Sequence, residues 1–152
     1  MATLRHLLTT LVVTPSLSAA WPDGPYATNG RWIIDRAGTN VPLAGVNWPA
    51  ALEAMVPEGL QYQSVEFIVS KVKSLGMNVV RLTYATQMVD EIFSNGEKDI
   101  TIQNAFVNAL GEENGTLVYE NVLKRNPSFS STTTRLQVVA HIFQCPYRLN
   151  HD

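Results

Sequence analysis

Four side chains that could bind a ligand lie at the ends of two short apolar runs in the sequence. Asn47 and Trp48 end the first run, and Arg81 and Tyr84 stand at the end of the second. A guanidinium binds carboxylates through paired N–H donors, and an aromatic ring with a polar handle can pack on a ligand while hydrogen-bonding to it. Each also has a structural explanation: Arg81 as an arginine paired with a nearby acid, Trp48 and Tyr84 as packing residues.

Several other chemistries lack the residues they need. The chain has one cysteine, Cys145, and no cluster of His, Asp and Glu at metal-ligand spacing, so we expect neither a metal site nor a cofactor. It has no Gly-rich phosphate loop and no Gly-x-Ser-x-Gly nucleophile turn. We expect the scattered carboxylates to be solvated surface groups: Asp35, Glu53, Glu58, Glu66 and Asp90.

The elements that position these residues begin with a predicted hairpin. Residues 31–35 and 41–47 read as strands around a glycine-containing turn. Ser64 is a good N-cap for an amphipathic helix whose apolar residues recur at helical spacing up to Leu75, and Gly76 is placed to end it. Residues 77–82 then predict a buried strand. The order strand, helix, strand predicts a βαβ unit with two parallel strands.

Three further helices are expected, without internal repeats or a linker that would divide domains. Residues 101–110 and 116–124 have helical spacing and end near Gly111 and Asn126. A polar Ser/Thr loop follows at 128–134. Residues 135–144 predict a last helix with one apolar face, made by Leu136, Val139, Ala140 and Phe143.

Composition narrows the class of protein. The chain has 152 residues, 45% hydrophobic and 16% charged, with a formal net charge of −2, as in an ordinary globular domain. Its basic residues are scattered, so we expect no nucleic-acid partner and no membrane-binding face. Residues 1–20 combine a basic flank, a short apolar run and small residues, which predicts a cleaved secretory signal and an extracellular protein; a buried N-terminal helix is the alternative. Asn114 begins the one N-glycosylation sequon.

At this point the sequence resembles a known family. "GRWIIDRAGTNVPLAGVNW" is similar to the N-terminal hairpin and first barrel strand of glycoside hydrolase family 5, the cellulase family. "SVEFIVSKVKSLGMNVVRLTY" resembles its first helix and second strand. "ALGEENGTLVYENVLKRNPSFSSTTTRLQVV" resembles a long excursion after the second strand in secreted fungal members. The likeness covers residues 24–139.

The resemblance implies an α/β fold, a (β/α)8 TIM barrel, and a retaining mechanism in which two glutamates cleave the O-glycosyl bonds of cellulose-like polysaccharides. It implies that Arg81 is the arginine that hydrogen-bonds the nucleophilic carboxylate. Asn47, Trp48 and Tyr84 would then contact the sugar, with the indole stacking on a pyranose ring. Polysaccharide or oligosaccharide is the partner that this implies.

The same resemblance predicts an incomplete barrel. A full barrel takes about 250 residues, and the family's Asn-Glu acid/base dipeptide does not occur in the chain. We therefore expect a signal peptide at 1–20, the N-terminal part of a catalytic barrel at 21–139, and a divergent tail at 140–152. Such a product would be inactive as given. The alternatives are a non-catalytic product with at most weak carbohydrate binding, and an unrelated small α/β domain.

Overall fold

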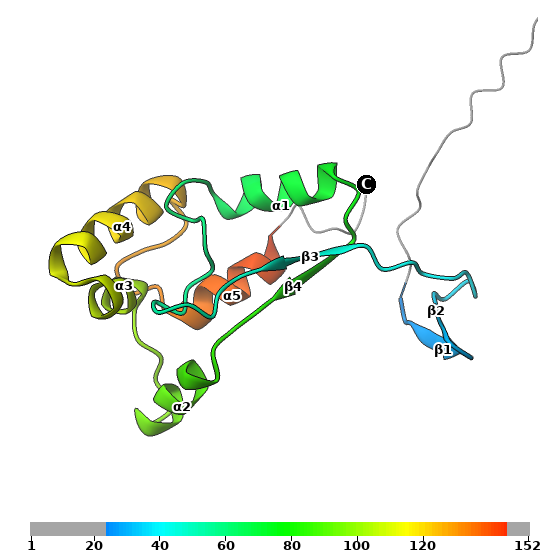
Figure 1. Ribbon diagram of the computed structural model, residues 1–152, viewed down its shortest axis with the longest axis horizontal. Coiled ribbons are helices and arrows are strands. Elements are labelled where there is room, and N and C mark those ends of the chain that lie inside the picture. Colours follow the sequence, from blue (N-terminus) through cyan, green and yellow to red (C-terminus); the bar gives the residue numbers. More distant parts are fainter. Residues whose placement is uncertain (1–23, 146–152) are drawn as a thin grey trace, which may run out of the picture.

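The computed structural model describes residues 24–145 (Figure 1), so the predicted signal peptide and residues 146–152 of the predicted tail lie outside the described part. No helix within the described residues is long and apolar enough to cross a membrane. The described chain is mixed α/β. The elements in chain order are β1 (Ala27–Asn29), β2 (Trp32–Ile34), β3 (Gly45–Trp48), α1 (Val65–Ser74), β4 (Val79–Leu82), α2 (Thr86–Ser94), α3 (Ile102–Leu110), α4 (Glu112–Arg125) and α5 (Arg135–Gln144).

The predicted βαβ unit is confirmed. Strands β3 and β4 pair in parallel, with Gly45 opposite Val79, and α1 forms the crossover between them. The Ser64 side chain accepts a hydrogen bond from the Phe67 amide at 3.2 Å, which satisfies one of the free donors of the first helical turn. After the helix, Gly76 has φ +75°, a backbone conformation that side chains with a Cβ rarely adopt. The strand β4 is half-buried, where a fully buried strand was predicted.

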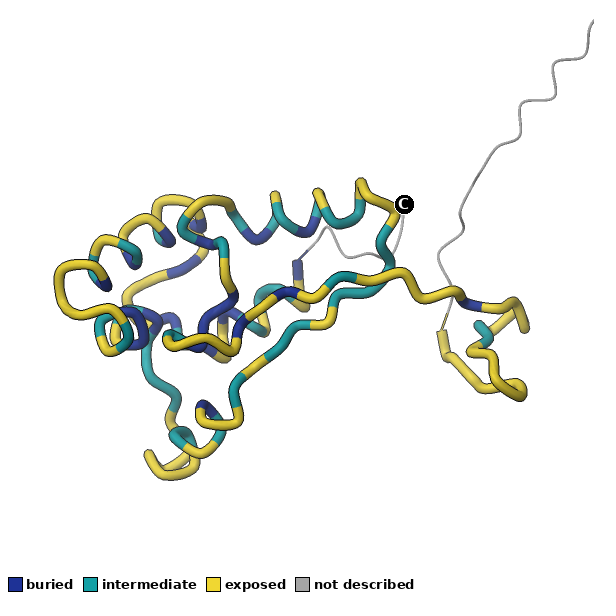
Figure 2. Tube along the Cα trace, in the orientation of Figure 1, coloured by how far each residue is buried: buried dark blue, intermediate teal, exposed yellow. Residues whose placement is uncertain are grey.

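The N-terminal hairpin differs from the prediction. Strand β2 pairs with β1, a strand that was not predicted, and the second predicted strand is reduced to β3. Part of the predicted pairing survives next to the turn: the Val41 amide donates to the Ile33 carbonyl at 2.8 Å, and Ile34 forms an antiparallel bridge with Asn40. The Asp35 carboxylate accepts from two turn amides, which stabilises the turn. The hairpin stands apart from the helices with mostly exposed residues (Figure 2).

The core lies between the β3–β4 sheet and the helices. Trp48 from β3 and Val80 and Leu82 from β4 pack on the same cluster as residues of α1, α3, α4 and α5. A hydrogen bond between the side chains of His141 and Glu66, with Nε2 and Oε1 3.2 Å apart, also joins α5 to α1. The fully enclosed members of the cluster are aliphatic: Leu60, Val65, Ile102, Val122 and Val138 are 0% exposed.

Helix α5 has the predicted bounds, but its predicted apolar face does not face the core. Leu136 and Phe143 are 44% and 65% exposed, whereas Arg135 and Val138 are buried. Thr134 and Gln137 form a reciprocal capping box at the start of the helix, and this fixes how the chain enters it. The helix is therefore rotated so that Arg135, a residue that a hydrophobic pattern assigns to the surface, faces the interior.

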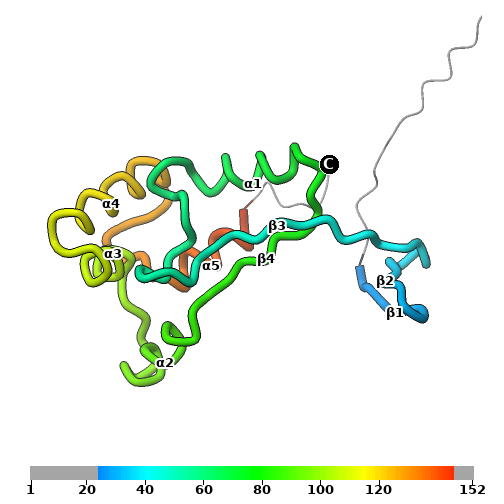
Figure 3. The backbone as a smooth tube through the Cα atoms, viewed as in Figure 1, coloured from blue at the N-terminus to red at the C-terminus, as the bar shows by residue number. Residues whose placement is uncertain are grey.

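Two of the helices between β4 and α5 differ from the predictions. Helix α2 was not predicted. Helix α4 begins at Glu112, four residues earlier than predicted, and its first turn carries Glu112 and Glu113, which suit the positive end of a helix dipole. Helices α3 and α4 lie against one another as a tight pair (Figure 3).

The close approach of α3 and α4 depends on Gly115. A Cβ atom added at Gly115 would lie 2.5 Å from the Val107 Cα and 2.6 Å from the Phe106 carbonyl oxygen. Both atoms belong to backbone, so neither can rotate away as a side chain could. Only a residue without a Cβ fits at this crossing.

We predict that Gly115→Ala lowers the free energy of unfolding by about 1–3 kcal/mol, because the added methyl group forces the two helix backbones apart. Asn114→Ala, at the exposed neighbouring position of the same helix, is the matched control and is expected to change stability by less than about 0.5 kcal/mol. Urea unfolding followed by circular dichroism measures both. Equal stability of the two variants would contradict the packing argument.

Candidate functional site

The parallel sheet places Asn47 and Arg81 side by side. They are register partners on β3 and β4, next to the carboxyl ends of the two strands, and both are exposed. Successive side chains of a strand point to opposite faces, and the adjacent pair Trp48 and Leu82 packs on the core. Asn47 and Arg81 therefore point to the other face of the sheet, away from the helices. Two of the predicted site residues are thus brought together.

Arg81 has no carboxylate partner among the described residues. Within residues 24–145 the structure shows neither an ion pair nor a side-chain hydrogen bond for its guanidinium. The described residues therefore do not support the structural explanation of Arg81, in which a nearby carboxylate neutralises the arginine at the strand end. The donors of the guanidinium remain open to a ligand or to a group outside these residues.

Trp48 and Tyr84 lie in different surroundings from this pair. Trp48 is 6% exposed, and its indole Nε1 donates to the Glu58 carbonyl oxygen at 2.8 Å, so the packing explanation describes it. Tyr84 is 63% exposed and lines a hollow of about 340 Å³ formed with α2 and α5. The residues that α5 contributes to this hollow are Leu136, Val139 and Phe143, three of the four that make up its predicted apolar face.

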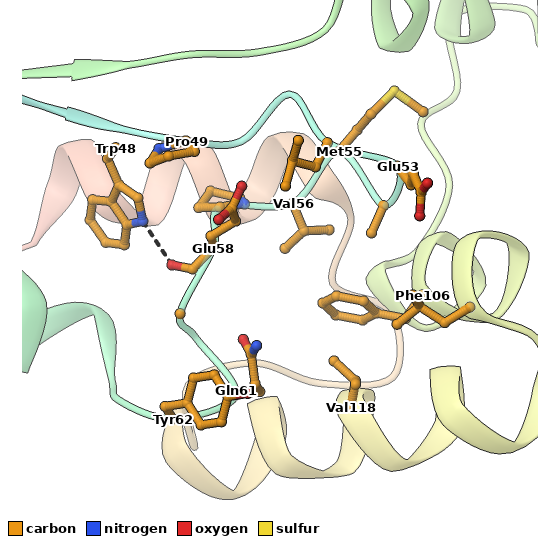
Figure 4. Close-up of a pocket in the computed structure, with 15 residues that line it drawn as sticks. Trp48, Pro49, Glu53, Met55, Val56, Glu58, Gln61, Tyr62, Phe106 and Val118 are labelled. Carbon is orange, nitrogen blue, oxygen red and sulfur yellow. Dashed lines mark hydrogen bonds between the residues drawn. The ribbon is translucent and has the colours of Figure 1, made fainter.

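A larger cavity, which the predicted site residue Trp48 helps to line, lies between the loop of residues 49–63 and the α3–α4 pair (Figure 4). Its volume is about 520 Å³. Phe106, Leu110 and Val118 form its helical wall. The loop supplies its polar groups, which are Glu53, Glu58, Gln61 and Tyr62. We call this cavity the loop pocket. The only sequence feature that could have indicated it was a long loop after the carboxyl end of a parallel strand, where α/β proteins commonly bind ligands.

The loop that forms this pocket is held in place by hydrogen bonds. The Glu58 amide donates to the Pro49 carbonyl at 2.9 Å, which closes the loop on itself next to the Trp48–Glu58 bond. Further along, the buried Asn126 side chain donates to the Leu60 carbonyl at 3.1 Å and accepts from the Val65 amide at 2.9 Å. Asn126 follows α4 directly, so this amide joins the loop, the start of α1 and the end of α4.

A buried arginine supports the other side of the loop. Arg135 is 1% exposed, and its Nη1 lies 2.8 Å from Glu91 Oε2 while its Nε lies 2.8 Å from Asp99 Oδ1. The second oxygen of Asp99 accepts from the Leu136 amide at 2.8 Å. Arg135 Nη1 also contacts the Met55 sulfur at 3.8 Å. This one side chain therefore ties α2, the segment before α3 and the loop to the start of α5.

The electrostatics of this cluster favour the ionised form of Glu91. Hydrogen bonds from Arg135 and Gln87 hold the pKa of Glu91 below its ordinary value, against a smaller opposing effect of burial. The Nη2 atom of Arg135 is buried and has no hydrogen-bond partner within the described residues. Among those residues no group of three or more His, Cys, Asp or Glu side chains is placed to hold a metal ion.

Comparison with known proteins adds a family relationship. No protein-family model matches the chain. It is 46% identical over 87 residues to a glycosyl hydrolase 5 family protein of Chamaecyparis obtusa, a match that covers 57% of this chain and 15% of that protein. It is 35% identical over 77 residues to an endoglucanase of Paenibacillus polymyxa, covering 49% of this chain and 19% of the relative. The chain is thus related to glycoside hydrolase family 5 over part of its length, and its aligned region spans less than a fifth of either relative.

We predict that Asp99→Ala lowers the free energy of unfolding by about 3 kcal/mol or more, because it leaves a buried guanidinium short of one carboxylate. Asp90→Ala is the control, since Asp90 is exposed on α2, one residue from the Arg135 partner Glu91. Urea unfolding at neutral pH measures both.

Removing Arg135 and Asp99 together, as Arg135→Met with Asp99→Ala, should lower the free energy of unfolding by less than the sum of the two single changes. Additive losses would show that the pair is not coupled.

The Glu91 pair also predicts a pH dependence. Because the folded protein depresses the pKa of Glu91, its contribution to stability is full above the unfolded-state value of about 4.3 and is lost as the pH falls through the folded pKa. We expect Glu91→Gln to be less stable than wild type at pH 7, with the gap narrowing towards pH 3. Urea midpoints across this range give the comparison, and a gap that widens in acid would refute it.

Proposed function

We propose that residues 21–139 form the N-terminal part of a secreted retaining glycoside hydrolase of the (β/α)8 type, acting on β-glucan or cellulose-like polysaccharides. The observation that carries the proposal is the exposed Asn47–Arg81 pair, next to the carboxyl ends of two parallel strands. In barrels of this architecture the active site forms at that end of the strands. The relatives, one named a glycosyl hydrolase and the other an endoglucanase, support the class of reaction.

In this proposal Arg81 acts on the nucleophile. Retaining hydrolysis needs one carboxylic acid to protonate the leaving oxygen and a carboxylate about 5–5.5 Å away to attack the anomeric carbon. A guanidinium beside the attacking carboxylate lowers its pKa through charge and donated hydrogen bonds, so that it stays ionised and nucleophilic. Asn47, on the same face of the sheet, would hold a sugar hydroxyl through its amide. Tyr84, exposed just beyond β4, would contact a neighbouring sugar ring.

The 152 residues by themselves are proposed to be catalytically inactive. The Asn-Glu dipeptide that carries the acid/base in the resembled family does not occur in the sequence, and the proposed arginine has no carboxylate beside it in the described residues. The second candidate function is therefore a non-catalytic product that binds carbohydrate. The exposed face of the β3–β4 sheet and its free edges would favour association of the isolated chain.

Secretion and glycosylation belong to the same proposal. The signal-like residues 1–20 would direct the chain to the extracellular space, where a polysaccharide substrate is found. Asn114 is exposed in the first turn of α4, which is compatible with an attached glycan.

We predict that the purified chain releases no reducing sugar from soluble β-glucan above a protein-free control. Turnover that disappears in Arg81→Ala would show that this polypeptide carries its own catalytic carboxylates, and would overturn the proposed inactivity.

A chimera tests the proposed role of Arg81 in an active context. The aligned part of this chain replaces the corresponding part of the Paenibacillus endoglucanase, and the chimera is assayed on soluble β-glucan. We expect hydrolysis, and we expect Arg81→Ala in the chimera to lower kcat by about 100-fold or more, as for loss of other charge-stabilising groups. Arg125→Ala, exposed at the end of α4, is the control for loss of a positive charge. Unchanged kcat in the Arg81 variant would remove Arg81 from the mechanism.

A further inference from the structure

One contact between helices α5 and α1 joins two groups that both titrate in mild acid. The His141 imidazole Nε2 lies 3.2 Å from Glu66 Oε1. The two side chains are 29% and 36% exposed, so water reaches both of them but surrounds neither. Glu66 was expected to be a solvated surface group, and the structure instead gives it a partner 75 positions away in the sequence. Neither residue belongs to the Asn47–Arg81 pair, so this contact lies outside the proposed function.

The imidazole is held in position by an aromatic neighbour. Phe129 is buried, and its ring meets the His141 ring at 79° with the two centroids 5.2 Å apart. Aromatic rings favour this edge-to-face arrangement. It restricts rotation of the imidazole, so the ring already has the orientation in which Nε2 reaches Glu66.

The Glu66 carboxylate is also oriented by groups other than His141. Partial burial alone would raise the pKa of Glu66, but hydrogen bonds from its own backbone amide, from His141 and from Ser64 outweigh burial and hold this pKa below its ordinary value. Exposed ion pairs usually contribute little to stability, in part because two mobile side chains must be ordered to form them. Here both side chains have further contacts that order them, so more of the electrostatic attraction is retained.

Glu66 is the one carboxylate within ion-pair distance of His141 among the described residues. Residues 126–134, which include Phe129, carry no charged group. Arg81 of β4 points to the opposite face of the sheet. The other charged or titratable groups on the surrounding elements are Lys71 and Lys73 on α1, Tyr119, Glu120, Lys124 and Arg125 on α4, Arg135 at the start of α5, and Cys145 after its end.

The charges of the pair depend on pH. An imidazole ordinarily gains its proton at about pH 6.5, and a glutamate loses its proton at about pH 4.3. Between these values the two groups carry opposite charges, and a charge-assisted hydrogen bond is about twice as strong as a neutral one. We propose that His141 and Glu66 form an acid-strengthened clasp between α5 and α1, in which a proton taken from solvent by the imidazole converts a neutral hydrogen bond into an ion pair.

The clasp has an upper and a lower pH limit. Its ion-pair contribution to stability is present below about pH 6.5 and is lost as the pH rises and the imidazole gives up its proton. At the acid end the contribution is lost as the pH falls through the folded-state pKa of Glu66, which lies below the ordinary value. The attraction between the two helices is therefore greatest in mild acid.

The test is a double-mutant cycle with Glu66→Gln, His141→Gln and the double variant, measured by urea unfolding at pH 8, 5.5 and 3.5. The cycle isolates the coupling of the pair from other titrating groups such as Glu91. We expect the coupling factor in the unfolding equilibrium constant to be about twofold to fivefold larger at pH 5.5 than at pH 8, and to fall again at pH 3.5. His141→Lys keeps its charge throughout, so its coupling with Glu66 should be equal at pH 8 and 5.5.

The matched control replaces Glu66→Gln by Glu120→Gln, an exposed carboxylate of α4 outside ion-pair distance of His141, and should show no coupling at any pH. Equal coupling of His141 with Glu66 at pH 8 and pH 5.5 would overturn the inference, because the contact would then be a hydrogen bond without a switch of charge. Coupling of the same size in the Glu120 cycle would also overturn it, since the effect would then come from the overall charge of the protein.

Discussion

A buried positive charge organises the side of the molecule that carries the loop. Arg135 cannot leave its guanidinium uncompensated in the interior, so Glu91 of α2 and Asp99 before α3 must both come to it. Asp99 also accepts from the first-turn amide of Leu136, so the same carboxylate neutralises the arginine and satisfies the helix start. The rotation of α5 follows from this arrangement. Once Arg135 and Val138 face inward, Leu136 and Phe143 have to face the hollow beside Tyr84.

The elements that sequence predicted well are those whose determinants are local. Ser64 caps α1, Thr101 caps α3, and glycines follow both helices at positive φ. The parallel pairing of β3 and β4 followed from the order of the elements alone. The inward face of α5 could not be predicted in this way, because hydrophobic periodicity counts an arginine as polar. Its ion pairs reach Glu91 and Asp99, residues separated from it by 44 and 36 positions.

In the candidate site, too, local features were predictable from the sequence and long-range contacts were not. The alternation of β3 and β4 was sufficient to place Asn47 with Arg81, because register partners of parallel strands share a face. It also puts Trp48 on the opposite face, where the indole is buried and bonded to the Glu58 carbonyl. No comparable pattern in the sequence indicated the loop pocket. Its walls come from a loop and from two helices more than forty residues away, and they meet only through long-range bonds such as those of Asn126.

Gly115 has a consequence for how this surface can change over evolutionary time. It is the middle residue of the sequon that begins at Asn114, and an N-glycosylation sequon accepts any residue except proline at that place. The crossing of α3 with α4 accepts only glycine there, because Val107 and Phe106 backbone atoms occupy the space of a Cβ. The sequon and the helix crossing both constrain residue 115, but the crossing allows far fewer residue types there. A change at Asn114 or Thr116 would therefore remove the sequon and leave the space at the helix crossing unchanged, whereas a change at Gly115 to any residue but proline would keep the sequon and disrupt the crossing.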